Sequence, residues 1–304
     1  MKRSILRAGT GAALVAAALG SATAPASAGE GDVISFTTTV NGDPADVYAP
    51  AAGDKDLPVA LLLQGANVGK ANYKKFATAV ASYGFVVVVP DHQRFVFGTP
   101  GLYAEASEAS STVAWAAQEN VRTGSPLSGD IDTGSLVLLG HSFGGAAALS
   151  IVTGACAPVF CTVPTPPPAQ LKGVALYGTN NLAPGTTTAP PIANGVPVQL
   201  VQGTADGVAT PAAGLATYNA VQNPPKMQVS LLGANHYGIT DTQTPPGAAP
   251  DPSPQTITQD VSIASTARWS AMYLRTALGD PWSKVWLYGV GPYVDKTVTV
   301  TYVK

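Results

Sequence analysis

Residues Leu136 to Ala146 read LVLLGHSFGGA. A run of apolar residues leads into a Gly-x-Ser-x-Gly motif, and small residues follow where a helix would begin. This strand–turn–helix context is what a nucleophile elbow requires, because the sharp turn presents a serine hydroxyl at the carboxyl end of the strand. Gly140 and Gly144 permit close backbone approach there, and the N-terminus of the following helix favours a developing oxyanion. The motif predicts Ser142 as a catalytic nucleophile.

A nucleophilic serine needs a general base, and the chain contains three histidines. His141 lies inside the motif, where its side chain would point away from the hydroxyl, and His92 precedes the nucleophile. This type of site orders its residues as serine, acid and histidine along the chain. His236, after the last predicted strand, is therefore predicted to be the base, with a solvent-exposed loop histidine as the alternative. A structural or rim role is expected for His92.

The acid of such a site should end the strand before the one that carries the histidine. Asp206 stands in this place, in the turn that follows the apolar run 198–201. Asp241 is the alternative, but it follows His236 too closely to arrive from a separate strand. The sequence therefore predicts that Asp206 orients the imidazole of His236.

An oxyanion formed during acyl transfer needs two backbone N–H donors, from the residue after the nucleophile and from the loop after an earlier strand. Phe143 and Ala66 occupy these places, the latter after Gln64 and Gly65 at the end of the run 59–63. We predict both as oxyanion-hole donors. An ordinary turn at the end of a strand would give the same residues around Ala66.

Short apolar runs alternate with helical patterns through the middle of the chain, which is typical of parallel strands covered on both faces. A hairpin at 33–40 and 45–49 precedes them, with its turn at 41–43. The sequence thus predicts the α/β class: a mostly parallel central sheet with an N-terminal antiparallel hairpin, helices on both faces and no large cap domain. The expected parallel strands are 59–63, 85–89, 136–139, 174–177, 198–201 and 229–232, and the expected helices are 73–83, 103–121, 146–153, 212–221 and 257–278.

Outside this alternation, three proline-rich segments follow elements that end near the predicted site, so they are either its rim or solvated spacers. They cover 158–168, 184–197 and 245–254. Residues 282–304 are predicted to form an appended pair of strands, because Val298, Val300 and Tyr302 alternate with threonines.

The N-terminus has the pattern of a secretory signal peptide. Three basic residues precede an apolar stretch, and Ala26-Ser27-Ala28 offers a small-residue cleavage site. A transmembrane helix is the alternative, but the apolar stretch is shorter than the roughly 20 residues that span a bilayer. We expect a signal peptide at 1–28, secretion, no stable membrane insertion, and one domain at 29–304 with an extension from about 281.

Charge and cysteine content narrow the possible partners. The net charge is −2 and becomes more negative without the signal peptide, which argues against a nucleic-acid partner. Cys156 and Cys161 are expected to form a local disulfide in an oxidising compartment. No histidine or acid lies at a ligand spacing beside this pair, so a metal site is not expected.

The chain resembles α/β-hydrolases of the chlorophyllase, dienelactone-hydrolase-like and bacterial polyester-hydrolase (cutinase-like) group. The resemblance rests on the 59–66 segment, the 80–91 segment, the elbow around Ser142, and the later Asp206 and His236. It implies a serine esterase without metal or organic cofactor. The chain departs from chlorophyllases at Phe143, where they usually carry arginine, and from polyester hydrolases at 177–180, where those carry a tryptophan.

These observations predict a secreted serine hydrolase that cleaves carboxylic esters through Ser142, His236 and Asp206 and an acyl-enzyme intermediate. A small-molecule or polymeric ester is the expected substrate, and a monomer the expected state. Two alternatives share the same residues: a secreted acyltransferase, and a catalytically inactive binding protein with this fold.

Overall fold

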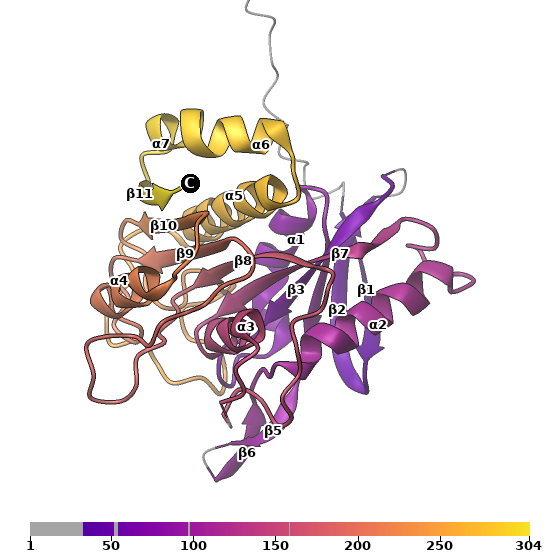
Figure 1. Cartoon of the computed structure of the whole chain (residues 1–304), viewed down its shortest axis with the longest axis horizontal. Helices are drawn as coiled ribbons and strands as arrows, with labels where there is room; N and C mark the ends of the chain where they lie inside the picture. The colour runs from indigo at the N-terminus through magenta and orange to yellow at the C-terminus, as the bar shows by residue number, and fades with distance from the viewer. Residues whose placement is uncertain (1–32, 52–53, 97, 158) are drawn as a thin grey trace, which may run out of the picture.

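A twisted central sheet organises the computed structural model, which describes residues 33–304 except 52–53, 97 and 158 (Figure 1). Within these residues nine strands form one sheet in the order β1-β2-β4-β3-β7-β8-β9-β10-β11. The six strands from β4 to β10 run parallel to one another, and the pairs β1–β2, β2–β4 and β10–β11 are antiparallel. Their bounds are β1 Val33–Val40, β2 Asp43–Pro50, β3 Leu57–Leu63, β4 Val86–Pro90, β7 Ile131–His141, β8 Leu171–Tyr177, β9 Val198–Gly203, β10 Lys226–Leu231 and β11 Val298–Val303.

Helices cover both faces of this sheet (Figure 1). Alternate residues of a strand point to opposite faces, and β3 shows the result: Leu61 and Leu63 enter the core under α2, α3 and α4, whereas Leu62 enters the core under α1 and α5. The long helices and the 3-10 turn are η2 Lys70–Tyr73, α1 Lys74–Ala81, α2 Ser107–Val121, α3 Phe143–Thr153, α4 Pro211–Ala220 and α5 Gln259–Ala277. The predicted fold class is confirmed, including the N-terminal hairpin.

The C-terminal segment differs from its prediction. Instead of a pair of strands, it contains the short helical turns α6 Pro281–Val285, η3 Trp286–Val290 and α7 Gly291–Val294, and only β11 is a strand. The helical start has a local cause, because the Asp280 carboxylate accepts hydrogen bonds from the N–H groups of Trp282 and Ser283, with proline at the first helical position. β11 then extends the main sheet beside β10.

Two further elements depart from the sequence prediction. A small hairpin, β5 Gln93–Val96 and β6 Thr99–Leu102, projects after β4. The helix predicted at 103–121 begins only at Ser107, because residues 103–106, directly after the hairpin, are not helical. Among the described residues, no helix is long and apolar enough to cross a membrane. The predicted signal peptide at 1–28 lies outside the described residues.

The connections that follow β8 and β10 at the carboxyl edge of the sheet are loops. The described chain forms no helix between β8 and β9 or between β10 and α5. The edge where the parallel strands end therefore has no large helical cap, as predicted.

Candidate active site

Ser142 lies between β7 and α3, in the strained turn that the motif predicts. Its φ is +52° and its ψ is −116°, a backbone conformation that non-glycine residues rarely adopt. The backbone N–H of Ser142 donates to the carbonyl of Tyr177 at 2.9 Å, which fixes the turn against β8. A Cβ at position 144 would collide with the carbonyl group of Leu63. The second glycine of the motif thus lets α3 begin against the end of β3.

The three predicted site residues meet at this edge of the sheet. Nε2 of His236 lies 2.8 Å from Oγ of Ser142, and Nδ1 of His236 lies 3.0 Å and 3.1 Å from the two carboxylate oxygens of Asp206. The side chains of His236 and Asp206 are almost fully buried, with 3% and 0% of their surface exposed, whereas Ser142 is half-buried. One imidazole therefore connects a partly accessible hydroxyl to a buried carboxylate.

The carboxylate of Asp206 is held by further donors. Oδ1 accepts the backbone N–H groups of Val208 and Ala209 at 2.9 Å and 2.8 Å, and Oδ2 accepts Nε2 of Gln202 at 3.1 Å. Hydrogen bonds to a carboxylate favour its charged form and compensate for its burial. This arrangement orients the carboxylate toward Nδ1 of His236.

The backbone of His236 is fixed by a residue that the sequence analysis did not identify. The Asp251 carboxylate accepts the N–H of His236 at 2.7 Å and the N–H of Gly207 at 3.2 Å, so it joins the histidine loop to the acid turn. Asp251 lies in the proline-rich segment 245–254, which is therefore more than a solvated spacer. The sequence places Asp251 in a segment that could form the rim of the site. No local pattern distinguishes it from an ordinary loop aspartate, so its role could not be predicted.

His141 links the elbow to the same loop. Nε2 of His141 lies 2.9 Å from the backbone carbonyl oxygen of His236, and Nδ1 lies 2.9 Å from the Tyr73 hydroxyl. The N–H of Gly65 donates to that hydroxyl at 2.9 Å. Because the Tyr73 hydroxyl accepts this hydrogen bond, it can donate its own proton to Nδ1 of His141. Nδ1 is then an acceptor, and the neutral imidazole carries its proton on Nε2. Burial keeps the ring in this form, because it lowers the pKa of His141 well below its usual range.

Two backbone N–H groups that were predicted to bind an oxyanion lie in suitable local structures. Phe143 is the first residue of α3, so its backbone N–H lies at the helix end that favours negative charge. In the loop after β3, the N–H groups of Gly65, Asn67 and Val68 donate to protein oxygens. Among the described residues no protein acceptor is found for the N–H of Ala66. This group is thus available to a ligand.

The two other acid and histidine candidates have different partners. The carboxylate of Asp241 accepts the N–H of Lys75 at 3.0 Å and lies at the start of α1. Nδ1 of His92 lies 2.7 Å from Asp43. Neither side chain contacts Ser142 in the described structure. This agrees with their positions in the chain, since His92 precedes the nucleophile and Asp241 follows His236 too closely.

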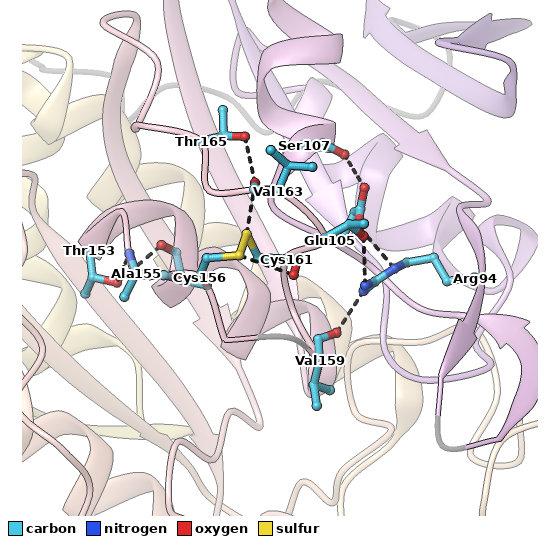
Figure 2. The surroundings of a disulfide bond; sticks show 12 residues. Arg94, Glu105, Ser107, Thr153, Ala155, Cys156, Val159, Cys161, Val163 and Thr165 are labelled. Atoms are coloured by element: carbon cyan, nitrogen blue, oxygen red, sulfur yellow. Dashed lines mark hydrogen bonds and ion pairs between the residues drawn. A yellow bond between two sulfur atoms is a disulfide. The ribbon is translucent and has the colours of Figure 1, made fainter.

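The predicted disulfide between Cys156 and Cys161 is confirmed. It closes a short loop after α3, and Figure 2 shows that this loop faces Arg94 and Glu105. Within the described residues no group of three or more histidine, cysteine or acidic side chains is arranged to hold a metal ion.

Comparison with known proteins agrees with this architecture. The sequence model of the chlorophyllase family matches residues 32–198. The chain is also 27% identical over 123 residues to Chlorophyllase-1 of Arabidopsis thaliana, an alignment that covers 40% of this chain and 37% of that protein. The chain thus matches little more than a third of the length of this relative. The family match includes the elbow but ends before Asp206 and His236. With more than half of its length matched, the chain belongs to the chlorophyllase family of α/β-hydrolases, and this membership supports an ester-hydrolase activity.

Proposed function

We propose that this protein is a secreted serine hydrolase that cleaves carboxylic esters, with Ser142 as nucleophile, His236 as general base and Asp206 as the orienting acid. The observation that carries the proposal is the continuous hydrogen-bond array from the Ser142 hydroxyl through the His236 imidazole to the buried Asp206 carboxylate. Nucleophile, base and orienting group within hydrogen-bond reach are the signature of covalent catalysis by serine.

In the first half of the reaction, Oγ of Ser142 attacks the ester carbonyl carbon while Nε2 of His236 takes the hydroxyl proton. The negative charge that develops on the carbonyl oxygen is stabilised by the N–H groups of Ala66 and Phe143. Nε2 then returns the proton to the departing alkoxide, the C–O bond breaks, and an alcohol leaves. The acyl group remains on Ser142.

The second half of the reaction repeats these steps with water. His236 takes a proton from water as its oxygen attacks the acyl-enzyme, and it then protonates Oγ of Ser142, which releases the carboxylic acid. Throughout, Asp206 holds Nδ1–H and stabilises the imidazolium that forms in each transition state.

Three features support the remaining parts of the proposal. The uncapped edge of the sheet would admit small-molecule or polymeric esters. The disulfide between Cys156 and Cys161 fits an oxidising compartment. The N-terminal signal pattern fits export.

The test is hydrolysis of p-nitrophenyl acetate by the protein without residues 1–28, with Ser142→Ala as the control. We expect ester cleavage by the wild type and a loss on the order of 10⁴-fold or more in kcat for the variant. Activity of Ser142→Ala within tenfold of the wild type would refute the assignment.

Product analysis with and without an added alcohol distinguishes a hydrolase from an acyltransferase, since only the latter would transfer most acyl groups to the alcohol.

A further inference from the structure

Three aromatic rings form a cluster around Phe143, the residue that follows the proposed nucleophile. Phe143, which directly follows Ser142, contacts the ring of Tyr103 at a centroid distance of 5.3 Å and the ring of Phe160 at 4.8 Å. Tyr103 is buried, whereas Phe143 and Phe160 are only half-buried. We call Tyr103, Phe143 and Phe160 the aromatic wall.

One end of the aromatic wall is attached to the predicted oxyanion loop. Nδ2 of Asn67, the residue after Ala66, donates to the Tyr103 hydroxyl at 3.4 Å, and Oδ1 of Asn67 accepts the N–H of Leu102 at 3.1 Å. The N–H of Tyr103 donates to the carbonyl of His92 at 3.0 Å. The position of Tyr103 is thus fixed by loops that follow two parallel strands.

The other end of the wall is carried by the disulfide loop. Phe160 precedes Cys161, its N–H donates to the carbonyl of Ala157 at 2.8 Å, and its carbonyl accepts the N–H of Ala106 at 2.9 Å. The bond between Cys156 and Cys161 closes the loop around these contacts. The backbone that bears Phe160 is therefore restrained from both sides.

An ion pair holds this loop against the segment before α2 (Figure 2). Arg94 donates to the carbonyl of Val159 at 2.8 Å and pairs with Glu105 at 3.1 Å. The Thr162 hydroxyl donates to the same carboxylate at 2.7 Å. Burial would raise the pKa of Glu105, but hydrogen bonds from the hydroxyls of Ser107 and Thr162 and the positive charge of Arg94 outweigh burial and lower this pKa, so the carboxylate stays charged.

We propose that Phe160, positioned by the Cys156–Cys161 disulfide, determines substrate selectivity by completing an apolar surface beside Ser142 for the acyl group of the ester. The favoured substrates are esters of bulky or long-chain apolar acids, because an aromatic surface gains binding free energy in proportion to the apolar area that it covers. This inference rests on the proposed function, since it assigns the acyl site of the same nucleophile.

The proposal is tested with p-nitrophenyl octanoate and p-nitrophenyl acetate, which share a leaving group and differ in the acyl chain. In Phe160→Ala we expect the ratio of kcat/KM for octanoate to that for acetate to fall about tenfold, through a higher KM for octanoate. Activity on acetate should fall less than activity on octanoate, because an acetyl group covers little of the aromatic surface. Phe160→Leu, which keeps an apolar side chain, should restore most of the ratio.

The role of the disulfide is tested with the double variant Cys156→Ser/Cys161→Ser, alone and combined with Phe160→Ala. The double variant should lower the octanoate-to-acetate ratio by itself, and should lower it no further when Phe160 is already absent, because neighbours that act through one side chain are not additive. Tyr293→Ala, which removes an aromatic ring that is 73% exposed on α7, is the matched control and should leave the ratio unchanged.

The outcomes separate this inference from the proposed function. A wild type that cleaves neither ester refutes the proposed function. A wild type that cleaves both, with an unchanged ratio in Phe160→Ala or equal losses on both esters, refutes the role of Phe160. Additive effects of the Phe160 and disulfide variants would show that the disulfide does not act by positioning this ring. Thermal unfolding of each variant checks that it is folded before kinetics are compared.

Discussion

Nε2 of His141, beside the nucleophile, lies 2.9 Å from the backbone carbonyl oxygen of His236. Since Tyr73 supplies a proton to Nδ1, Nε2 of the neutral His141 ring is the donor in this hydrogen bond. A single buried imidazole therefore holds the elbow and the loop of the proposed base in a fixed relation. Protonation of His141 would place an unpaired buried charge between the elbow and the His236 loop.

This arrangement predicts a loss of stability in acid. Burial lowers the pKa of His141, so the unfolded chain binds this proton at a higher pH than the folded chain. The stabilisation is complete above the ordinary histidine pKa of about 6.5 and is lost as the pH falls below it, by up to about 1.4 kcal/mol per pH unit. Urea unfolding at pH 7 and pH 5 measures the difference.

The matched variant for this measurement is His141→Gln, which keeps a donor for the carbonyl of His236 but has no titrating group. It should lose less unfolding free energy between pH 7 and pH 5 than the wild type does, because all other titrating groups are common to both proteins. Equal losses would show that His141 is not the group responsible.

The choice of acid is tested by a pair of substitutions. Asp206→Asn should keep the fold and lower kcat on the order of 10³-fold to 10⁴-fold, because an amide favours the wrong tautomer of His236 and cannot stabilise the imidazolium. Asp241→Asn should change kcat by less than about twofold, since its carboxylate caps α1 through Lys75. The reverse pattern in steady-state kinetics would transfer the role to Asp241.

Gly178 offers a third test, because it faces the imidazole–carboxylate pair directly. A Cβ at this position would lie 3.0 Å from Oδ2 of Asp206 and 3.0 Å from Nδ1 of His236, and its φ is +55°. Gly178→Ala should therefore displace the pair and lower kcat on the order of 100-fold, as small misplacements of catalytic groups do.

Gly185→Ala is the control for backbone strain. Gly185 also has a positive φ, +77°, but no atom lies within 4 Å of a Cβ placed there. Gly185→Ala should lower the free energy of unfolding and leave kcat unchanged. If both variants kept full activity, the contact of Gly178 with the pair would have no catalytic consequence.

The sequence was sufficient to predict the sheet and the three side chains that meet at its edge, because motif, chain order and strand ends are local signals. Asp251 could not be predicted, since its contact with His236 depends on how a proline-rich loop folds back over 15 residues. The predicted C-terminal strand pair was half wrong for a local reason. The alternation of Val298 and Val300 does form β11, but Asp280 before Pro281 caps a helical turn where the first strand was predicted.

The most direct test of the central claim is covalent labelling of the folded protein with a fluorophosphonate, followed by mass spectrometry of its peptides. The hydrogen bond from Ser142 to His236 predicts one adduct on Ser142 that is lost in Ser142→Ala, strongly slowed in Asp206→Asn, and absent when the protein is unfolded in urea beforehand. No adduct in the folded wild type, or an adduct on a different serine, would contradict the assignment of Ser142 as the nucleophile.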